Sequence, residues 1–237
     1  AITPQCRVLL LNTPHNPTGA VLSAEEIAEI GAVCRKHDLW IVCDEVYEQL
    51  VFGATFASPF DNPGLAERTI VVSSISKSHA APGFRSGWAI GPAEFCTRLL
   101  SVSETMLFGG QPFIADMTAY ALDNPIATAA TMRRTYQARA TRFATALAKA
   151  PGLLPLPPEA GMFIVVDVAG TGLSGEDFAW ALLREELVAV MPGSSFGDAA
   201  EDYIRLSLTV PDDHIDEACR RIAALAARSA SPKERRA

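Results

Sequence analysis

The chain has 237 residues, of which 49% are hydrophobic and 20% charged, which is the composition of a globular protein. Its 27 acidic residues outnumber its 20 basic ones and give a formal net charge of −7, which argues against nucleic acid or an anionic membrane as a partner. The sequence contains no uninterrupted apolar run of about 20 residues, the length that a membrane span requires.

Three apolar, β-branched-rich runs predict the first strands, at residues 7–11, 40–43 and 69–73. Continuous apolar runs of this kind are typical of strands buried on both faces of a parallel sheet. Between the first two runs, Ser23 precedes Glu25 and Glu26, which predicts the N-cap and first turn of an amphipathic helix. Strand, helix and strand together predict a right-handed βαβ unit.

The rest of the chain predicts a continuation of this sheet and a second, smaller α/β unit. The sheet continues through residues 86–91, a helical region follows Pro112, and a long helix runs from Thr128 to about residue 149. After a break at 151–158 we expect strand, helix, strand and helix, at residues 162–167, 175–186, 203–208 and 213–227. Residues 1–127 are predicted to form part of a large domain, and residues 128–228 a linking helix with a small C-terminal domain. Residues 229–237 are predicted to be a disordered polar tail.

Polar segments follow the first three predicted strands: residues 12–19, residues 44–47 and residues 73–85. Because ligands bind beyond the carboxyl ends of parallel strands, we expect Asn16, Asp44 and Lys77 to meet at one edge of the sheet. The segments supply an amine, a carboxylate, a phenol, an amide, hydroxyls and a guanidinium. These groups can hold and tune pyridoxal 5′-phosphate (PLP).

The motifs in these segments resemble those of the PLP-dependent class I/II aminotransferases of fold type I. They are Asn-Pro-Thr-Gly, Asp-x-x-Tyr, Ser-x-x-Lys and Gly-x-Arg, at residues 16–19, 44–47, 74–77 and 83–85. The resemblance covers residues 7–225. Residues 76–79, 161–163 and 171–174 look most like bacterial aspartate-aminotransferase-like enzymes and arginine:pyruvate transaminases.

This resemblance implies an α/β fold, specifically the C-terminal part of a fold-type-I PLP transferase. The C-terminal part of such a transferase has a mostly parallel sheet flanked by helices, and a smaller α/β domain. In this chain the sheet would belong to the PLP-binding region at residues 1–127. Family members carry roughly 150 further residues before the position of Ala1, a second domain's worth. We therefore expect the chain as given to be incomplete and poorly active.

The resemblance also assigns catalytic roles. Lys77 would bond covalently to the cofactor and then move a proton at the substrate α-carbon, for which its amine must be neutral. Asp44 would pair with the protonated pyridine nitrogen of PLP. Tyr47 and Asn16 would hydrogen-bond the phenolic oxygen of the cofactor.

Further residues would bind the cofactor phosphate and the substrate. Ser74 and Arg85 would contact the phosphate, which a guanidinium binds through charge-assisted, often bidentate hydrogen bonds. Arg205 lies in an alternating strand and would bind the substrate α-carboxylate. Asn16 and Phe163 would line the substrate pocket, although core packing explains Phe163 equally well.

Three functions remain open for such a chain. The first is an aminotransferase that moves an amino group between an amino acid and a 2-oxo acid. The second is a PLP-dependent carbon–sulfur β-lyase, because the same lysine, aspartate and arginine serve both reactions. The third is a non-catalytic, aminotransferase-like domain that senses PLP.

Cysteine usage bears on location and metal binding. The five cysteines are scattered, and neither they nor the four histidines have the paired spacing of a metal site. With no signal peptide expected, they indicate reduced thiols in a cytoplasmic protein. We expect a homodimer when the protein is complete, with no metal, nucleic acid or membrane partner.

Overall fold

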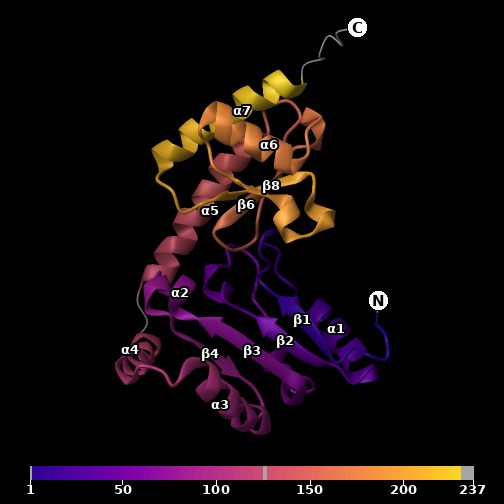
Figure 1. The fold of residues 1–237 in the computed structure, drawn as a ribbon, viewed down its shortest axis with the longest axis vertical. Helices are drawn as coiled ribbons and strands as arrows, with labels where there is room; N and C mark the ends of the chain where they lie inside the picture. Colours follow the sequence, from indigo (N-terminus) through magenta and orange to yellow (C-terminus); the bar gives the residue numbers. More distant parts are fainter. Residues whose placement is uncertain (1, 125–126, 231–237) are drawn as a thin grey trace. The chain divides into compact units, whose positions relative to one another are not determined.

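A computed structural model describes residues 2–124 and 127–230 (Figure 1). Within it the chain divides into two compact units. Unit 1 contains the residues up to 16 and residues 20–133, and unit 2 contains residues 17–19 together with the chain from residue 134 onward. Each unit has one four-stranded sheet.

The sheet of unit 1 has the order β1-β2-β3-β4. Its strands are β1 (Val8–Asn12), β2 (Trp40–Asp44), β3 (Thr69–Ser74) and β4 (Gly87–Ile90). The first three strands are parallel, and β4 is antiparallel to β3. The predicted strands and the mostly parallel sheet are therefore confirmed, and the carboxyl ends of three strands lie at one edge.

Helix α1 (Ala24–Lys36) connects β1 to β2 and begins as predicted. Ser23 Oγ accepts a hydrogen bond from Glu26 N, and Glu26 Oε2 accepts one from Ser23 N, which completes a capping box. The buried side of α1 carries Ile27 and Cys34, which form a core with other buried residues: Leu39, Ile41, Cys43 and Leu65. This core fixes β2 beneath the helix and so fixes the position at which β2 ends.

In the chain as given, β1 is not covered on both faces, unlike the expectation for its apolar run. Val8 and Leu10 are 54% and 71% exposed, whereas Leu9 and Leu11 pack against the core beneath α1. Among the described strands, β1 has a neighbour on one side only. Alternate side chains of β1 point to opposite sides of the sheet, and in this chain only the side that carries Leu9 and Leu11 is covered.

Three helices follow β4: α3 (Ala93–Leu107), α4 (Pro112–Asp123) and α5 (Thr128–Leu147). The region after Pro112 and the long helix from Thr128 are confirmed as helical. Helix α3 was not predicted from the sequence. It has Pro92 at its N-cap position without a capping side-chain hydrogen bond, and none of its residues is buried, so both the start signal and the apolar stripe are weak.

The sheet of unit 2 is antiparallel, with the order β5-β6-β8-β7. Its strands are β5 (Leu154–Leu156), β6 (Phe163–Asp167), β7 (Met191–Pro192) and β8 (Tyr203–Ser207). The break predicted at residues 151–158 contains β5 and is therefore wrong in part. Pro155 lacks a backbone donor, which an edge strand such as β5 tolerates.

Two further helical segments complete unit 2. Helix α6 (Gly175–Ala181) continues as a π-helical turn, η6 (Leu182–Glu186), and α7 spans Asp212–Ala230. Residues 229 and 230, predicted to belong to a disordered tail, are helical, and residues 231–237 of that tail lie outside the described residues. Over the described part of the chain, none of the helices combines the length and the apolarity that crossing a membrane requires.

Candidate active site

The register of the parallel strands brings three polar segments to the same edge of unit 1. Asn12 at the end of β1 is the partner of Asp44 at the end of β2, and Asp44 is the partner of Val72 in β3. Helix α2 (Ile75–Ser78), a single turn that carries Lys77, follows β3 directly. The structure therefore places Asn16, Asp44 and Lys77 on segments that leave the same edge, as ligand sites of open parallel sheets require.

Asn12 joins two of these segments, a role that sequence analysis missed. Its Nδ2 donates a hydrogen bond to the carbonyl of Asp44 at 3.1 Å, and its Oδ1 accepts one from Asn16 N at 2.7 Å. The carbonyl of Asp44 also accepts a hydrogen bond from Thr13 N. A polar amide at the end of an apolar strand was the available signal for this role.

The carboxylate of Asp44 is oriented by its own turn. Asp44 is half-buried, and its Oδ1 accepts a hydrogen bond from Val46 N at 3.1 Å. Tyr47 is 6% exposed and precedes the short helix η1 (Glu48–Leu50), where Leu50 N donates to the Tyr47 carbonyl. Asp44 and Tyr47 therefore stand on a tight turn fixed by backbone hydrogen bonds.

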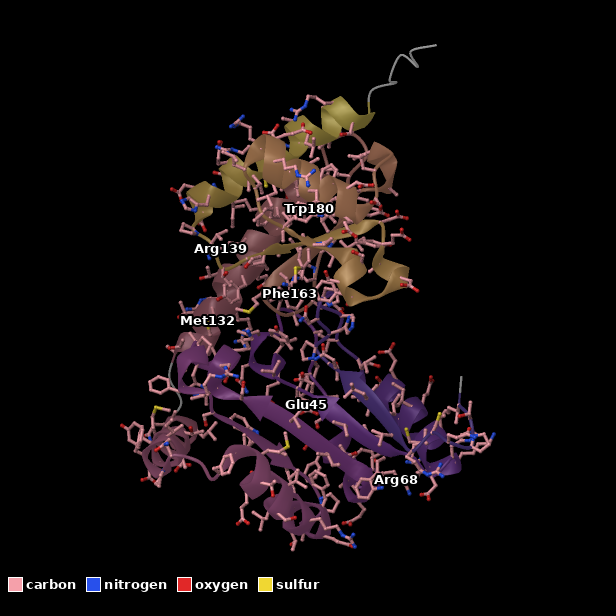
Figure 2. All side chains as sticks on the ribbon, viewed as in Figure 1. Glu45, Arg68, Met132, Arg139, Phe163 and Trp180 are labelled. Carbon is pink, nitrogen blue, oxygen red and sulfur yellow. The ribbon has the colours of Figure 1, made fainter. Side chains whose placement is uncertain are left out.

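Glu45 is a buried acid beside Asp44 that sequence analysis did not select (Figure 2). It is 3% exposed, and its Oε1 accepts a hydrogen bond from Ser58 Oγ at 2.6 Å. Burial raises the pKa of Glu45 to about 7, against the opposing hydrogen bonds of Ser58 and Cys43. The nearby carboxylates of Glu48 and Asp61 raise it further. A large part of the Glu45 population therefore carries a proton near neutral pH.

Ser74, Lys77 and Arg85 surround the end of β3. Ser74 is the N-cap of α2, and its Oγ accepts a hydrogen bond from Ser76 N at 3.2 Å. Lys77 is half-buried on the same turn. Arg85 is exposed, has left-handed backbone angles with φ of 53°, and donates from Nη1 to the carbonyl of Pro82 at 3.0 Å.

The two remaining predicted site residues, Arg205 and Phe163, belong to unit 2. Arg205 lies in the middle of β8, opposite Val165 of β6 and Met191 of β7. Phe163 begins β6 and is 3% exposed. The Cζ atom of Arg205 lies 5.5 Å from the centroid of the Phe163 ring, so these two residues are direct neighbours.

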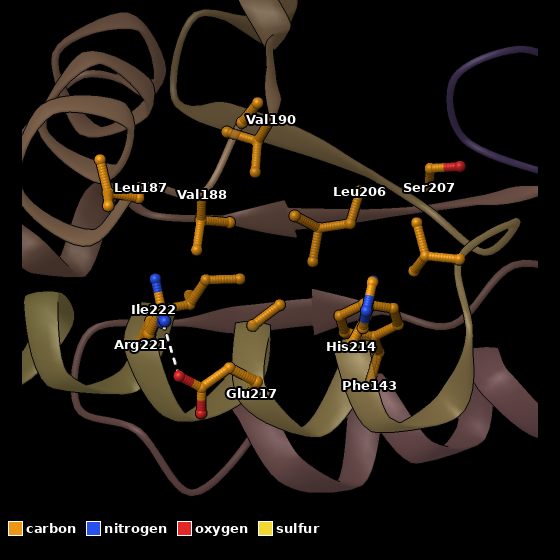
Figure 3. Close-up of a pocket in the computed structure, with 13 residues that line it drawn as sticks. Phe143, Leu187, Val188, Val190, Leu206, Ser207, His214, Glu217, Arg221 and Ile222 are labelled. Carbon is orange, nitrogen blue, oxygen red and sulfur yellow. Dashed lines mark hydrogen bonds and ion pairs between the residues drawn. The ribbon is translucent and has the colours of Figure 1, made fainter.

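A pocket of about 290 Å³ in unit 2 contains none of the predicted site residues (Figure 3). Apolar side chains such as Val188, Leu206 and Ile222 line it, together with an ion pair in which Arg221 Nε lies 2.7 Å from Glu217 Oε1. Hydrogen bonds from Arg220 and Arg221 hold the pKa of Glu217 at about 2. The pocket offers apolar surface but lacks the amine and amide groups of the strand-end cluster in unit 1.

Comparisons with known proteins agree with this arrangement. The family model described as aminotransferase class I and II matches residues 1–222. The chain is 44% identical over 226 residues to the arginine–pyruvate transaminase of Pseudomonas aeruginosa, covering 95% of the chain and 58% of that protein. It is 37% identical over 247 residues to a probable N-succinyldiaminopimelate aminotransferase of Mycobacterium tuberculosis, covering 98% of the chain and 61% of that protein.

Solved structures share the fold. The aromatic aminotransferase from Pyrococcus horikoshii matches with a TM-score of 0.91 at 32% identity, over 94% of this chain and 61% of that one. The chain thus spans 58–61% of the length of these relatives. The fold type predicted from the motifs, an α/β arrangement with a mostly parallel sheet and a smaller unit, is confirmed.

Proposed function

Because the chain belongs to the class I and II aminotransferases, we propose that the whole protein moves an amino group between an amino acid and a 2-oxo acid with PLP as its cofactor. The observation that carries the proposal is the pairing of Asn12 with Asp44 and of Asp44 with Val72. This register lets an amide, a carboxylate and an amine leave one sheet edge together. The same register would also serve a β-lyase, and the transaminase is favoured because the matched relatives are named as aminotransferases.

The residues at this edge fit the cofactor. When bound, PLP supplies an electron-withdrawing ring that stabilises negative charge at the substrate α-carbon. Asp44, held by Val46 N, keeps a proton on the pyridine nitrogen. The amine of Lys77 would hold the cofactor, and the same amine would move the proton at the substrate α-carbon.

The other unit 1 residues bind and orient the cofactor. Tyr47 and Asn16 hydrogen-bond its phenolic oxygen. Ser74 and Arg85 bind the phosphate, and for Arg85 this means exchanging the Pro82 carbonyl for a phosphate oxygen, a stronger charge-assisted partner. These roles follow from the chemistry of each side chain and from its place at the strand ends.

Arg205 of unit 2 binds the substrate α-carboxylate, and the substrate-binding roles of Asn16 and Phe163 are part of the same proposal. A guanidinium suits this role because its planar donors match the two oxygens of a carboxylate. Arginine with pyruvate is the first substrate pair to test, because the relative with 44% identity is named for that pair.

We extend the proposal to domains, assembly and location. Residues 1–127 form part of the PLP-binding domain, and residues 128–228 form the linking helix and small domain. The protein works as a homodimer, a proposal supported by large exposed apolar side chains on and after α3 and on α4: Leu100, Met106, Leu107, Phe108, Phe113 and Tyr120. Five unpaired cysteines support a cytoplasmic location.

Replacement of Lys77 tests the proposal. In the whole protein, Lys77→Ala should abolish amino-group transfer from a panel of arginine, aspartate and alanine, while PLP still binds through its phosphate and ring contacts. The exposed residue Lys149 provides the matched control, because Lys149→Ala removes an amine of the same kind from the turn that follows α5. Transfer assays and PLP absorbance report the two outcomes.

Near-native transfer by Lys77→Ala would overturn the assignment of Lys77. Release of pyruvate and ammonia from cysteine-type substrates by the unaltered protein, without amino-group transfer, would instead establish the β-lyase.

A further inference from the structure

Arg205 is a half-buried cation on a strand whose opposite face belongs to the core of unit 2. In β8, Ile204 and Leu206 are 0% and 4% exposed, and Arg205 points to the other face. Ser207, on the same face as Arg205, is the register partner of Phe163. Phe163 is therefore a diagonal neighbour of Arg205 across the β6–β8 pair, within reach of a long side chain.

Two aromatic rings contact the guanidinium. The Cζ atom of Arg205 lies 5.5 Å from the ring centroid of Phe163 and 5.0 Å from that of Phe196. Both distances are within the range of about 6 Å over which an aromatic face attracts a cation. Phe163 comes from β6, and Phe196 ends the short helix η7 (Gly193–Phe196) that follows β7, so two separate segments converge on Arg205.

Glycines allow both rings to reach Arg205. Gly161 has φ of 92°, and a Cβ atom there would lie 2.9 Å from Cζ of Phe163, so any side chain would displace that ring. At the start of η7, a Cβ atom on Gly193 would lie 2.7 Å from the Tyr203 carbonyl. The backbone of η7 therefore approaches the start of β8 closely, and this approach places Phe196 over the strand.

We propose that Phe163 and Phe196 are positioning residues, which hold the Arg205 guanidinium in the orientation that accepts the substrate α-carboxylate. The inference rests on the proposed function and deepens it. An aromatic face attracts the cation without supplying an anion that would compete with the substrate. It also restricts a flexible side chain before binding, and this lowers the entropic cost of forming the bidentate contact.

The proposal changes the role assigned to Phe163 from the sequence. Phe163 acts through Arg205 instead of selecting the substrate side chain. Every amino acid and every 2-oxo acid carries the α-carboxylate, so loss of either ring weakens the binding of both substrates by a similar factor. The cofactor affinity does not depend on these rings.

Phe196 is the residue to replace, because it is half-buried whereas Phe163 is 3% exposed. Phe196→Leu and Phe196→Met remove the aromatic face and keep apolar volume, and Phe196→Tyr keeps the face. Trp180 provides a matched control within unit 2, because its ring lies 5.0 Å from Cζ of Arg184 and its side chain is 48% exposed. Trp180→Leu therefore removes a cation–π pair of the same length away from Arg205.

Binding is measured in the whole protein loaded with PLP, using 2-methylalanine, an α-amino acid that has no α-proton. We expect its Kd, and the KM of both substrates, to rise roughly three- to tenfold in Phe196→Leu and Phe196→Met, with little change in kcat. Phe196→Tyr should restore both, and Trp180→Leu should match the unaltered protein. The Nε–H resonance of Arg205, assigned by its loss in Arg205→Lys, should shift in Phe196→Leu, because the ring current of Phe196 is removed.

The variants separate two kinds of failure. If Arg205→Lys leaves 2-methylalanine binding unchanged, the proposed carboxylate role of Arg205 is wrong. If Arg205→Lys weakens binding but neither Phe196→Leu nor Phe196→Met does, the carboxylate role stands and the positioning inference is overturned. Equal weakening by Trp180→Leu would also overturn the inference, because the effect would then be general to unit 2.

Discussion

The two units position their candidate site residues in different ways. In unit 1 the residues stand on turns that follow parallel strands, and hydrogen bonds to the backbone hold them, as with Asp44 and Val46 N. In unit 2, Arg205 stands in the middle of an antiparallel strand, with aromatic rings near its charge. The backbone of a turn fixes the short side chain of Asp44, whereas the long side chain of Arg205 lies against two aromatic rings, the contact on which our positioning proposal rests.

The two arrangements also differ in which substitutions leave the side chain in its place. A turn residue such as Asp44 keeps its place as long as its backbone bonds and its acceptor oxygen remain, whatever its charge. Arg205 depends on residues in β6 and η7, which lie far from it in the sequence. A substitution in unit 1 should therefore be able to alter the reaction rate while leaving the free energy of unfolding unchanged, and a substitution in unit 2 should do so less readily.

Asp44→Asn should give the largest effect and the sharpest test of this separation. The amide oxygen can still accept the hydrogen bond from Val46 N, so we expect the free energy of unfolding to change little. Because an amide cannot keep a proton on the pyridine nitrogen, α-proton abstraction should slow by orders of magnitude. Single-turnover kinetics with an amino acid, alongside denaturant unfolding, measure both quantities.

Asp38→Asn is the matched control for this prediction. Asp38 is exposed, with φ of 51°, and its ion pair with Arg68 lies at the surface, at 3.4 Å. The same chemical change should there leave the rate of α-proton abstraction unaltered. An unchanged rate in Asp44→Asn would show that the carboxylate has no part in the chemistry.

Glu45→Gln should give an intermediate effect that depends on pH. The pKa of Glu45 is about 7 in the folded protein, above its ordinary value of 4.5, so the folded state retains a proton that the unfolded chain has lost. Its contribution to stability is therefore complete below pH 4.5 and is lost as the pH rises through 7. Glutamine stays neutral. Between pH 4.5 and pH 7 and above, the free energy of unfolding of Glu45→Gln should therefore fall by about 2–3 kcal/mol less than that of the unaltered protein.

Urea unfolding at several pH values measures this difference. Glu67→Gln replaces an exposed carboxylate of unit 1 and should keep the pH dependence of the unaltered protein. Parallel curves for Glu45→Gln and the unaltered protein would mean that Glu45 ionises in the folded state as it does in the unfolded chain.

Asn12→Ala should give the smallest effect and is the unit 1 counterpart of Phe196→Leu. The substitution removes the hydrogen bond that Asn12 donates to the Asp44 carbonyl and the one that it accepts from Asn16 N. It should lower the free energy of unfolding by about 1–2 kcal/mol. It should also loosen the segment that carries Asn16, seen as faster amide hydrogen exchange. Asn124→Ala, which removes the bond from an exposed amide to the Tyr120 carbonyl, should leave exchange at Asn16 unaltered.

Local patterns predicted much of unit 1. The three parallel strands were placed to within one residue, and the N-cap and first turn of α1 were identified from Ser23, Glu25 and Glu26. The expected meeting of strand ends follows from parallel topology alone. Helix α3 was not predicted, because it has no side chain that caps its N-terminus and no row of buried apolar residues along one face.

Other features depend on contacts between segments that are distant in the sequence, and they could therefore not be predicted from the sequence. The side-chain bonds of Asn12 reach across to β2, and Glu45 is buried because Ser58 and the core enclose it. Phe196 lies between the helix predicted at 175–186 and the strand predicted at 203–208 and was not selected, since its closeness to Arg205 depends on how η7 packs on β8. Roles that rest on such packing become visible only in three dimensions.

The edge strand β1 has a kinetic consequence for anyone who produces this chain. Its outer backbone groups and the exposed side chains of Val8 and Leu10 form a template onto which another extended segment can add. Pairing within one molecule is a first-order event, whereas pairing between molecules is second-order in protein concentration. Dilution during refolding should therefore favour the folded protein over aggregates, and the yield should fall as the concentration rises.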